Sequence, residues 1–194
     1  MLTFKNIDFP NYKNSLNYKD SLFLIGSCFA ENINASLSGD HFKTFANPFG
    51  ICFNPKSIAT ILHRVLDKNY YNESDFFFHD NYYWCFEHHG VHAQINLNDY
   101  IKSSNEIIDF AFDYLKNCSV LIITFGTSYV YSFGNKVVAN CHKQPSNTFN
   151  SFNLSIDDIT NDYDILIQKL KIINPDIQII FTVSPVRYIS HGIV

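Results

Sequence analysis

The stretch Leu22-Phe23-Leu24-Ile25-Gly26-Ser27-Cys28-Phe29-Ala30 decides the fold that the sequence predicts. Its first four residues are apolar, as in a strand buried on both faces, and Gly26 ends the run. The segment 31–37 that follows carries Ile33 and Leu37 at helical spacing. The stretch therefore predicts a strand over 21–25, a tight turn and then a helix.

Strands and helices are expected to alternate along the rest of the chain. Apolar runs predict further strands over 42–46, 120–125 and 177–183, and helical spacing predicts helices over 55–66, 106–116 and 155–173. Two segments, 76–86 and 129–139, have the aromatic, turn-containing pattern of inserted β-hairpins. Buried strands that alternate with helices imply right-handed crossovers. The predicted fold class is therefore α/β, a three-layer α/β/α sandwich with a parallel central sheet.

The composition favours one compact domain. The chain has 194 residues, of which 46% are hydrophobic, and a net charge of -4. Phosphate binding needs clustered Lys and Arg, which the sequence lacks, so we expect no nucleic-acid partner. No apolar run reaches the roughly 20 residues of a membrane span, and the N-terminus lacks the pattern of a secretory signal. The expected compartment is the cytoplasm.

The cysteines are expected to be reduced thiols. They are Cys28, Cys52, Cys85, Cys118 and Cys141, an odd number without CxxC spacing. This spacing argues against a disulfide framework and against a zinc ribbon.

Ser27 is the candidate nucleophile. In parallel sheets the active groups lie at the carboxyl ends of strands, and Ser27 directly follows a predicted strand and opens a helix. Such a serine gains an exposed hydroxyl, nearby backbone N–H donors and the positive end of a helix, all of which suit acyl transfer. The alternative is that Ser27 only caps the helix. Cys28 is a second possible nucleophile, although a thiol beside an apolar Phe is more often a small buried hydrophobe.

Five ordered blocks of the sequence resemble the GSCFA family. They are Gly26-Ser27-Cys28-Phe29-Ala30, which spells the family name, Asn47-Pro48-Phe49-Gly50-Ile51 with Asn54-Pro55, Phe125-Gly126-Thr127, Asn140-Cys141-His142-Lys143, and Ser184-Pro185-Val186-Arg187. The family is bacterial and is similar to the SGNH or GDSL hydrolases. The resemblance implies a flavodoxin-like, SGNH hydrolase-like sandwich.

The resemblance also implies roles for single residues. Ser27 matches the SGNH nucleophile, and Gly50 matches the glycine whose N–H joins the oxyanion hole; the N–H of Ser27 would be another donor. The third SGNH block normally supplies an Asn two residues after its Gly, but this chain has Ser128 there. We expect Asn140 to take that place, carried over the strand end by the 129–139 hairpin, unless it merely closes a turn.

The catalytic base is not identified. SGNH enzymes carry an Asp-x-x-His pair near the C-terminus, and no such pair occurs after Asn140. We therefore interpret 1–194 as a single GSCFA/SGNH-like domain that lacks its C-terminal part and, as it stands, is inactive. His142 is expected to contact substrate or to be structural, and His191 is a weak candidate for catalysis. Arg187 is expected to position a substrate anion, or else to pair with a surface carboxylate.

No cofactor or metal is expected. His88, His89 and His92 cluster beside Glu87, but their spacing is that of a strand rather than the i, i+4 spacing of a helical metal site. A flavodoxin-like nucleotide module would need a phosphate-cradling GxGxxG or P-loop segment, which the sequence lacks.

The leading functional hypothesis is an SGNH-like serine esterase that acts on O-acyl groups, including acetyl groups on a carbohydrate. Its partner would be a small-molecule or carbohydrate ester. An O-acyltransferase of the same fold differs only in the acceptor. The alternative from another class is a non-catalytic domain that uses the cleft to bind a glycan or a partner.

Overall fold

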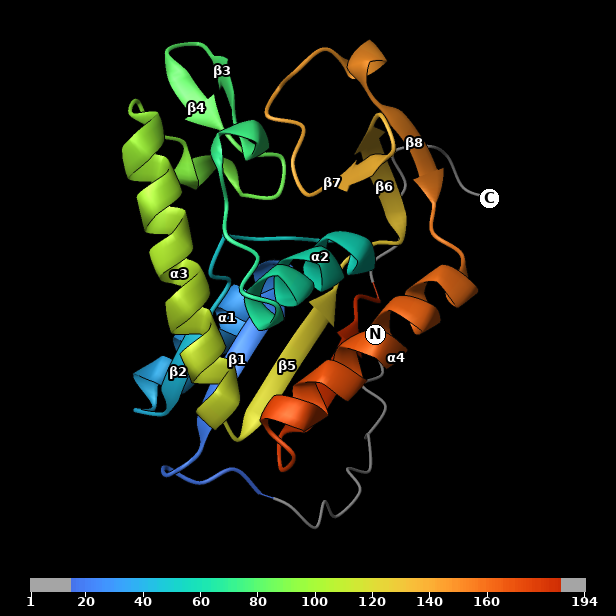
Figure 1. Cartoon of the computed structure of the whole chain (residues 1–194). Helices are drawn as coiled ribbons and strands as arrows, with labels where there is room; N and C mark the ends of the chain where they lie inside the picture. The colour runs from blue at the N-terminus through green and yellow to red at the C-terminus, as the bar shows by residue number, and fades with distance from the viewer. Residues whose placement is uncertain (1–14, 186–194) are drawn as a thin grey trace, which may run out of the picture.

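The computed structural model describes residues 15–185, and its centre is a parallel sheet of four strands. The strands are β1 (Ser21–Gly26), β2 (Lys43–Ala46), β5 (Val120–Phe125) and β9 (Gln178–Val183). They are arranged in the order β2-β1-β5-β9, and each neighbouring pair is parallel (Figure 1). The register pairs Gly26 with Thr124, so β1 and β5 end side by side.

Four helices cover the two faces of the sheet. They are α1 (Cys28–Gly39), α2 (Pro55–Leu66), α3 (Leu97–Asn117) and α4 (Ile156–Ile173). In Figure 1, α2, α3 and α4 lie in front of the sheet and α1 lies behind it. The predicted α/β sandwich with a parallel central sheet is confirmed, and the arrangement is consistent with a flavodoxin-like fold.

The alternation of side chains along each strand explains the two layers of core. On β1, Phe23 and Ile25 join the large cluster of buried residues packed under α2, α3 and α4. Their neighbours Leu22 and Leu24 point to the opposite face and pack with Ala30 of α1. A strand with apolar residues at every position is buried on both faces, as the sequence predicts.

The helix ends follow local capping chemistry. Ser155 and Asp158 form a reciprocal capping box at the start of α4. The start of α3 was predicted too late, at 106. It begins at Leu97 because Asn96 caps it, and its early buried face includes Ser104, a polar residue that hides the helical period.

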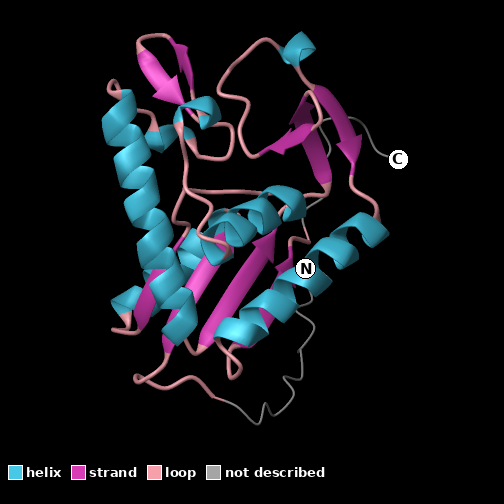
Figure 2. Ribbon diagram, in the orientation of Figure 1, coloured by secondary structure: helices cyan, strands magenta, loops and turns pink. Residues whose placement is uncertain are grey.

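Two insertions lie beyond the carboxyl ends of the sheet strands (Figure 2). The first is the hairpin of β3 (Phe77–His79) and β4 (Tyr82–Trp84), with the short helices η1 (Glu73–Asp75) and η2 (Gly90–His92) on either side. The second is an antiparallel sheet of β7 (Lys136–Val138), β6 (Tyr129–Phe133) and β8 (Asn150–Asn153), with η3 (Ser146–Thr148) before β8. Both predicted hairpins are confirmed, whereas β8 was not predicted because its four residues are exposed and mostly polar.

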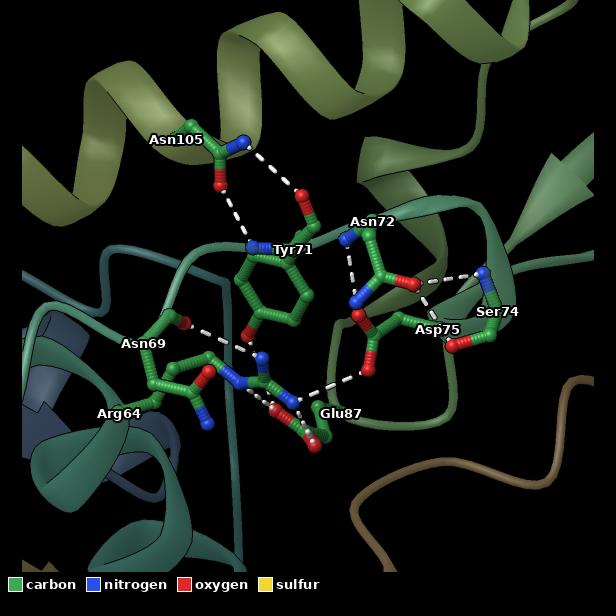
Figure 3. A network of polar contacts seen from close by, with 8 residues as sticks. All are labelled: Arg64, Asn69, Tyr71, Asn72, Ser74, Asp75, Glu87 and Asn105. Atoms are coloured by element: carbon green, nitrogen blue, oxygen red, sulfur yellow. Dashed lines mark hydrogen bonds and ion pairs between the residues drawn. The ribbon is translucent and has the colours of Figure 1, made fainter.

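Arg64 fastens the first insertion to α2 (Figure 3). Its guanidinium donates to both carboxylate oxygens of Glu87 at 2.8 Å and to Asp75 at 3.2 Å. It also lies over the ring of Tyr71, 4.0 Å from the centroid, and the Tyr71 hydroxyl donates to Glu87. Burial by itself lowers the pKa of Arg64. The hydrogen bond to Glu87 and the negative charge of Glu87 outweigh burial and raise the pKa of Arg64 above its ordinary value. This network ties the first insertion to the sandwich.

No helix among residues 15–185 combines the length and the apolar character that crossing a membrane requires.

Candidate active site

A large cavity opens at the carboxyl edge of the sheet, between the sandwich and the second insertion. Its volume is about 1030 Å³. The floor comes from the start of α1 and the ends of β5 and β9, and the roof comes from β6 and β7. Most wall residues are apolar or aromatic, including Phe29, Phe53, Phe125, Val130 and Val138. The cavity therefore suits an uncharged and largely apolar group.

Ser27 lies in the floor of this cavity, at the N-terminus of α1. It is the N-cap of the helix, and its Oγ accepts a hydrogen bond from the N–H of Phe29 at 3.3 Å. The side chain is largely covered, with the residue 5% exposed, but it still lines the cavity. The structure thus gives Ser27 both properties considered from the sequence, a cap and a hydroxyl at the strand end.

Thr124 holds Ser27 from the neighbouring strand. The N–H of Ser27 donates to Oγ1 of Thr124 at 2.8 Å and to its carbonyl oxygen at 3.1 Å. The two hydroxyl oxygens are 3.0 Å apart, and either can be the donor. Because Thr124 Oγ1 also accepts the Ser27 N–H, Thr124 fixes both the backbone and the hydroxyl of Ser27.

Gly26 is required for this approach. Its φ is +130°, and a Cβ at this position would collide with the carbonyl oxygen of Thr124. A residue with a side chain would therefore push β1 away from β5 and separate Ser27 from Thr124.

Gly50 lies away from the cavity floor. Its N–H donates to the carbonyl oxygen of Asn47 at 2.8 Å, and its α-carbon packs against the side chain of His89. Gly50 is not among the residues of the described chain that line the cavity. The structure therefore does not bring this predicted oxyanion donor to Ser27, and the N–H of Ser27 itself is occupied by Thr124.

Asn140 closes a turn next to the cavity. Its Oδ1 accepts the N–H of His142 at 2.8 Å, and its own N–H donates to the carbonyl oxygen of Phe86 at 3.3 Å. Its neighbour Cys141 lines the cavity, but Asn140 is not among the lining residues described for 15–185. The geometry thus matches the turn-closing alternative.

His142 joins the two insertions. The residue is 6% exposed, and its Nε2 lies 2.7 Å from the carbonyl oxygen of Cys85. Its ring is 4.9 Å from that of Trp84. Burial lowers the pKa of His142, so the imidazole is neutral near pH 7. These contacts point to a structural role. Arg187 and His191 lie outside the described residues.

The histidine cluster packs as a core. His88 is fully buried, stacks on Phe49 with ring centroids 4.4 Å apart, and has its Nδ1 3.0 Å from the hydroxyl of Tyr100. Burial lowers the pKa of His88 well below its ordinary value. Within residues 15–185, no group of three or more His, Cys, Asp or Glu side chains is arranged to hold a metal ion.

The thiols differ in access. All five cysteines are unpaired, and Cys28 is exposed beside Ser27, whereas Cys141 is partly covered in the cavity wall. Burial raises the pKa of Cys141 above its ordinary value and raises that of Cys52 to about 12. A raised pKa leaves less thiolate at neutral pH, so Cys141 and Cys52 are weak nucleophiles.

The comparisons with known proteins agree with the five sequence blocks. The model of the GSCFA family matches residues 21–194. The chain belongs to the GSCFA family. Searches of the curated proteins and of the solved structures each find no match. The GSCFA match includes every strand of the central sheet and every described residue that lines the cavity.

The cavity of this GSCFA chain is uncharged. No carboxylate, imidazole or ammonium group occurs among its described lining residues, and the polar ones are Ser, Thr, Asn, Cys and Tyr. No base for Ser27 is therefore found among the described residues that line the cavity.

Sequence reasoning missed two residues of the candidate site, Thr124, which bonds to Ser27, and Asn54, which lines the cavity. Thr124 is the polar residue in an otherwise apolar strand, a signal that could have been noticed. Asn54 caps α2 and lines the cavity with Ser27. Its Asn-Pro context indicated only a helix start, because the contact of Asn54 with the cavity depends on the tertiary fold.

Proposed function

We propose that this protein is a serine esterase that cleaves O-acyl esters, with Ser27 as the nucleophile. One observation carries the proposal: the Ser27 hydroxyl lies at the N-terminus of a helix and faces a cavity of about 1030 Å³. A helix N-terminus favours the negative charge that develops in acyl transfer.

The proposed reaction passes through an acyl-enzyme. Ser27 Oγ bonds to the acyl carbon as its proton passes to a general base, the C–O bond to the alcohol breaks, and the alcohol leaves with a proton. Water then attacks the acyl-enzyme, which releases the carboxylic acid and restores Ser27. The base is an imidazole, as the resemblance to SGNH enzymes implies, supplied from outside residues 15–185.

The walls of the cavity support an uncharged acyl group larger than acetyl. Phe53, Phe125, Val130 and Val138 offer apolar contacts, and the described walls hold no cation that would pair with a charged acyl chain. Ligand cavities of roughly 300–1,000 Å³ accommodate drug-sized molecules. An acyl chain of several carbons and part of its alcohol, such as a sugar, would fit in such a volume.

Ester hydrolysis by the full-length protein tests the proposal. We expect the protein to hydrolyse 4-nitrophenyl esters and Ser27→Ala to abolish the reaction. Ser36→Ala is the matched control, because Ser36 lies on the exposed face of the same helix and outside the cavity. Equal rates for wild type and Ser27→Ala would overturn the nucleophile assignment.

Two other functions share this cavity. An O-acyltransferase would use the same acyl-enzyme with a second alcohol in place of water, so products formed with added alcohols distinguish it. A non-catalytic glycan-binding or partner-binding domain is favoured by the uncharged cavity, which has no base among its described lining residues. Binding of glycans without any turnover by the full-length protein would support that alternative.

We also propose the cytoplasm as the compartment. The support is that all five cysteines are unpaired thiols, as in a reducing environment.

A further inference from the structure

An acyl-transfer site needs hydrogen-bond donors for the oxygen of the acyl carbonyl, which becomes negative as the nucleophile attacks. The two backbone donors expected from the sequence are already used. The N–H of Ser27 donates to both oxygens of Thr124, and the N–H of Gly50 donates to the carbonyl oxygen of Asn47. Other donors must therefore face the cavity.

Asn54 offers one such donor. It is only 6% exposed and lines the cavity together with Ser27. Its Oδ1 accepts the N–H of Ser57 at 2.8 Å. Only the oxygen of a carboxamide can accept from an N–H, so this bond fixes the orientation of the group and leaves the Nδ2 amide at the other end.

The Nδ2 group of Asn54 makes no hydrogen bond with any residue in the described part of the chain. Nδ2 is not among the buried side-chain atoms without a partner in residues 15–185, so it is open to the cavity that Asn54 lines. The helix cap uses only the oxygen of Asn54, so the nitrogen can donate to an acceptor atom of a ligand in the cavity.

Cys28 offers a second donor through its backbone. It is the first residue of α1, where an N–H has no acceptor within the helix. Its N–H donates to no residue in the range 15–185. Cys28 directly follows Ser27 and lines the same cavity.

We infer that Nδ2 of Asn54 and the N–H of Cys28 form the oxyanion hole for an ester carbonyl attacked by Ser27. The inference rests on the proposed function. As Oγ of Ser27 bonds to the acyl carbon, an electron pair moves onto the carbonyl oxygen, which the two donors hold. The pair returns when the C–O bond to the alcohol breaks. Asn54 thereby supplies the side-chain amide that Ser128 does not.

Asn54→Ser separates the two functions of this side chain. The Ser hydroxyl is as good a helix cap as Asn and accepts the N–H of Ser57, but the Nδ2 donor is lost. We expect kcat for 4-nitrophenyl ester hydrolysis to fall roughly 10²–10³-fold, as for the loss of one oxyanion donor. We expect KM to change less than about twofold, because the donor acts in the transition state.

Asn54→Asp sharpens the test. The Asp carboxylate keeps one oxygen that accepts the N–H of Ser57, but its other oxygen places an acceptor where the oxyanion needs a donor. The loss of kcat in Asn54→Asp should therefore be at least as large as in Asn54→Ser. Asn96→Ser is the matched control, because Asn96 caps α3 in the same way and lies outside the cavity. It should leave kcat unchanged.

Cys28→Pro tests the backbone donor. Pro is well tolerated at the first position of a helix and removes the N–H together with the thiol, and the extended backbone of Ser27 suits a residue before Pro. Cys28→Ala lacks the thiol but keeps the N–H, so the loss is measured against this variant. We expect a loss of kcat of about tenfold or more. Ile156→Pro is the control, since Ile156 is the exposed first residue of α4 behind the extended cap Ser155.

The outcomes distinguish this inference from the proposed function. Thermal unfolding of each variant identifies any loss of folded protein. The inference is supported if the Ser27→Ala variant is inactive and the Asn54→Ser and Cys28→Pro variants are both impaired. If Ser27→Ala is inactive but Asn54→Ser is folded and has the kcat of the wild type, the assignment of the oxyanion hole is wrong. The assignment of Ser27 as the nucleophile is then unaffected. An active Ser27→Ala overturns both.

Discussion

The cavity lining and the buried histidines of the two insertions differ in their access to a ligand. The lining carries a hydroxyl and an amide, those of Ser27 and Asn54. The insertions carry stronger bases, the imidazoles of His88 and His142, but Phe49 covers His88 and Trp84 packs against His142. Titratable side chains that were conspicuous in the sequence thus hold the insertions in place, while uncharged polar groups line the cavity. The difference teaches that residue type alone does not indicate where chemistry occurs.

The largest expected effect is on the stability of the first insertion. Arg64→Met removes the guanidinium and leaves Glu87 and Asp75 partly buried without their partner. Loss of one partner of a buried pair costs roughly 3–5 kcal/mol. Because Glu87 is partly exposed, we expect the free energy of unfolding in urea to fall by about 3 kcal/mol. An unchanged urea midpoint would contradict the role assigned to this network.

The next effect concerns the cavity floor. Thr124→Val removes the hydroxyl that bonds to both the N–H and the Oγ of Ser27. A lost buried hydrogen bond costs about 1–3 kcal/mol, so we expect kcat to fall about 10–100-fold. Thr124→Ser keeps the hydroxyl and should restore most of the activity. Equal activity of the Val and Ser variants would mean that Thr124 does not position Ser27.

Each carbon added to the acyl chain of the ester should raise kcat/KM several-fold. Burial of a CH₂ group is worth about 0.8 kcal/mol, close to a fourfold gain. We expect kcat/KM of the full-length protein to rise along a series of 4-nitrophenyl esters from acetate through octanoate. A series that falls from acetate onward would show that the apolar cavity does not hold the acyl group.

The smallest effect is on stability against pH. Burial lowers the pKa values of His88 and His142 in the folded protein, so below about pH 6.5 the unfolded chain binds more protons than the folded one. The free energy of unfolding should therefore have its full value above pH 6.5 and decrease on acidification, by at most about 1.4 kcal/mol per pH unit for each histidine. Urea unfolding between pH 7.5 and about 5 measures the slope. Replacement of His88 by Phe should reduce it.

Much of the fold could be predicted because its strands are local apolar runs. The four central strands and both hairpins follow directly from periodicity and turn residues. β8 gave no such signal, since its side chains are exposed and its position depends on pairing with β6. The early part of α3 was hidden by Ser104, whose burial reflects its tertiary neighbours.

The candidate site could be predicted only in part. Ser27 was identified because strand, glycine and helix are adjacent in sequence. Thr124 and Asn54 are respectively 97 and 27 positions away from it, and they reach the site through the register of β5 and the segment before α2. Gly50 was assigned by resemblance, and Asn140 by the expectation that the 129–139 hairpin carries it over the strand end. Their partners in the fold, Asn47 and His142, were not visible in the pattern.

Labelling with a fluorophosphonate probe tests the central claim most directly. The probe bonds preferentially to an activated serine, and mass spectrometry of the labelled full-length protein locates the bond. Our account predicts a single labelled serine, Ser27, and loss of labelling in Ser27→Ala but not in Ser36→Ala. Labelling that persists in Ser27→Ala, or wild-type protein that hydrolyses esters without labelling at Ser27, would contradict it.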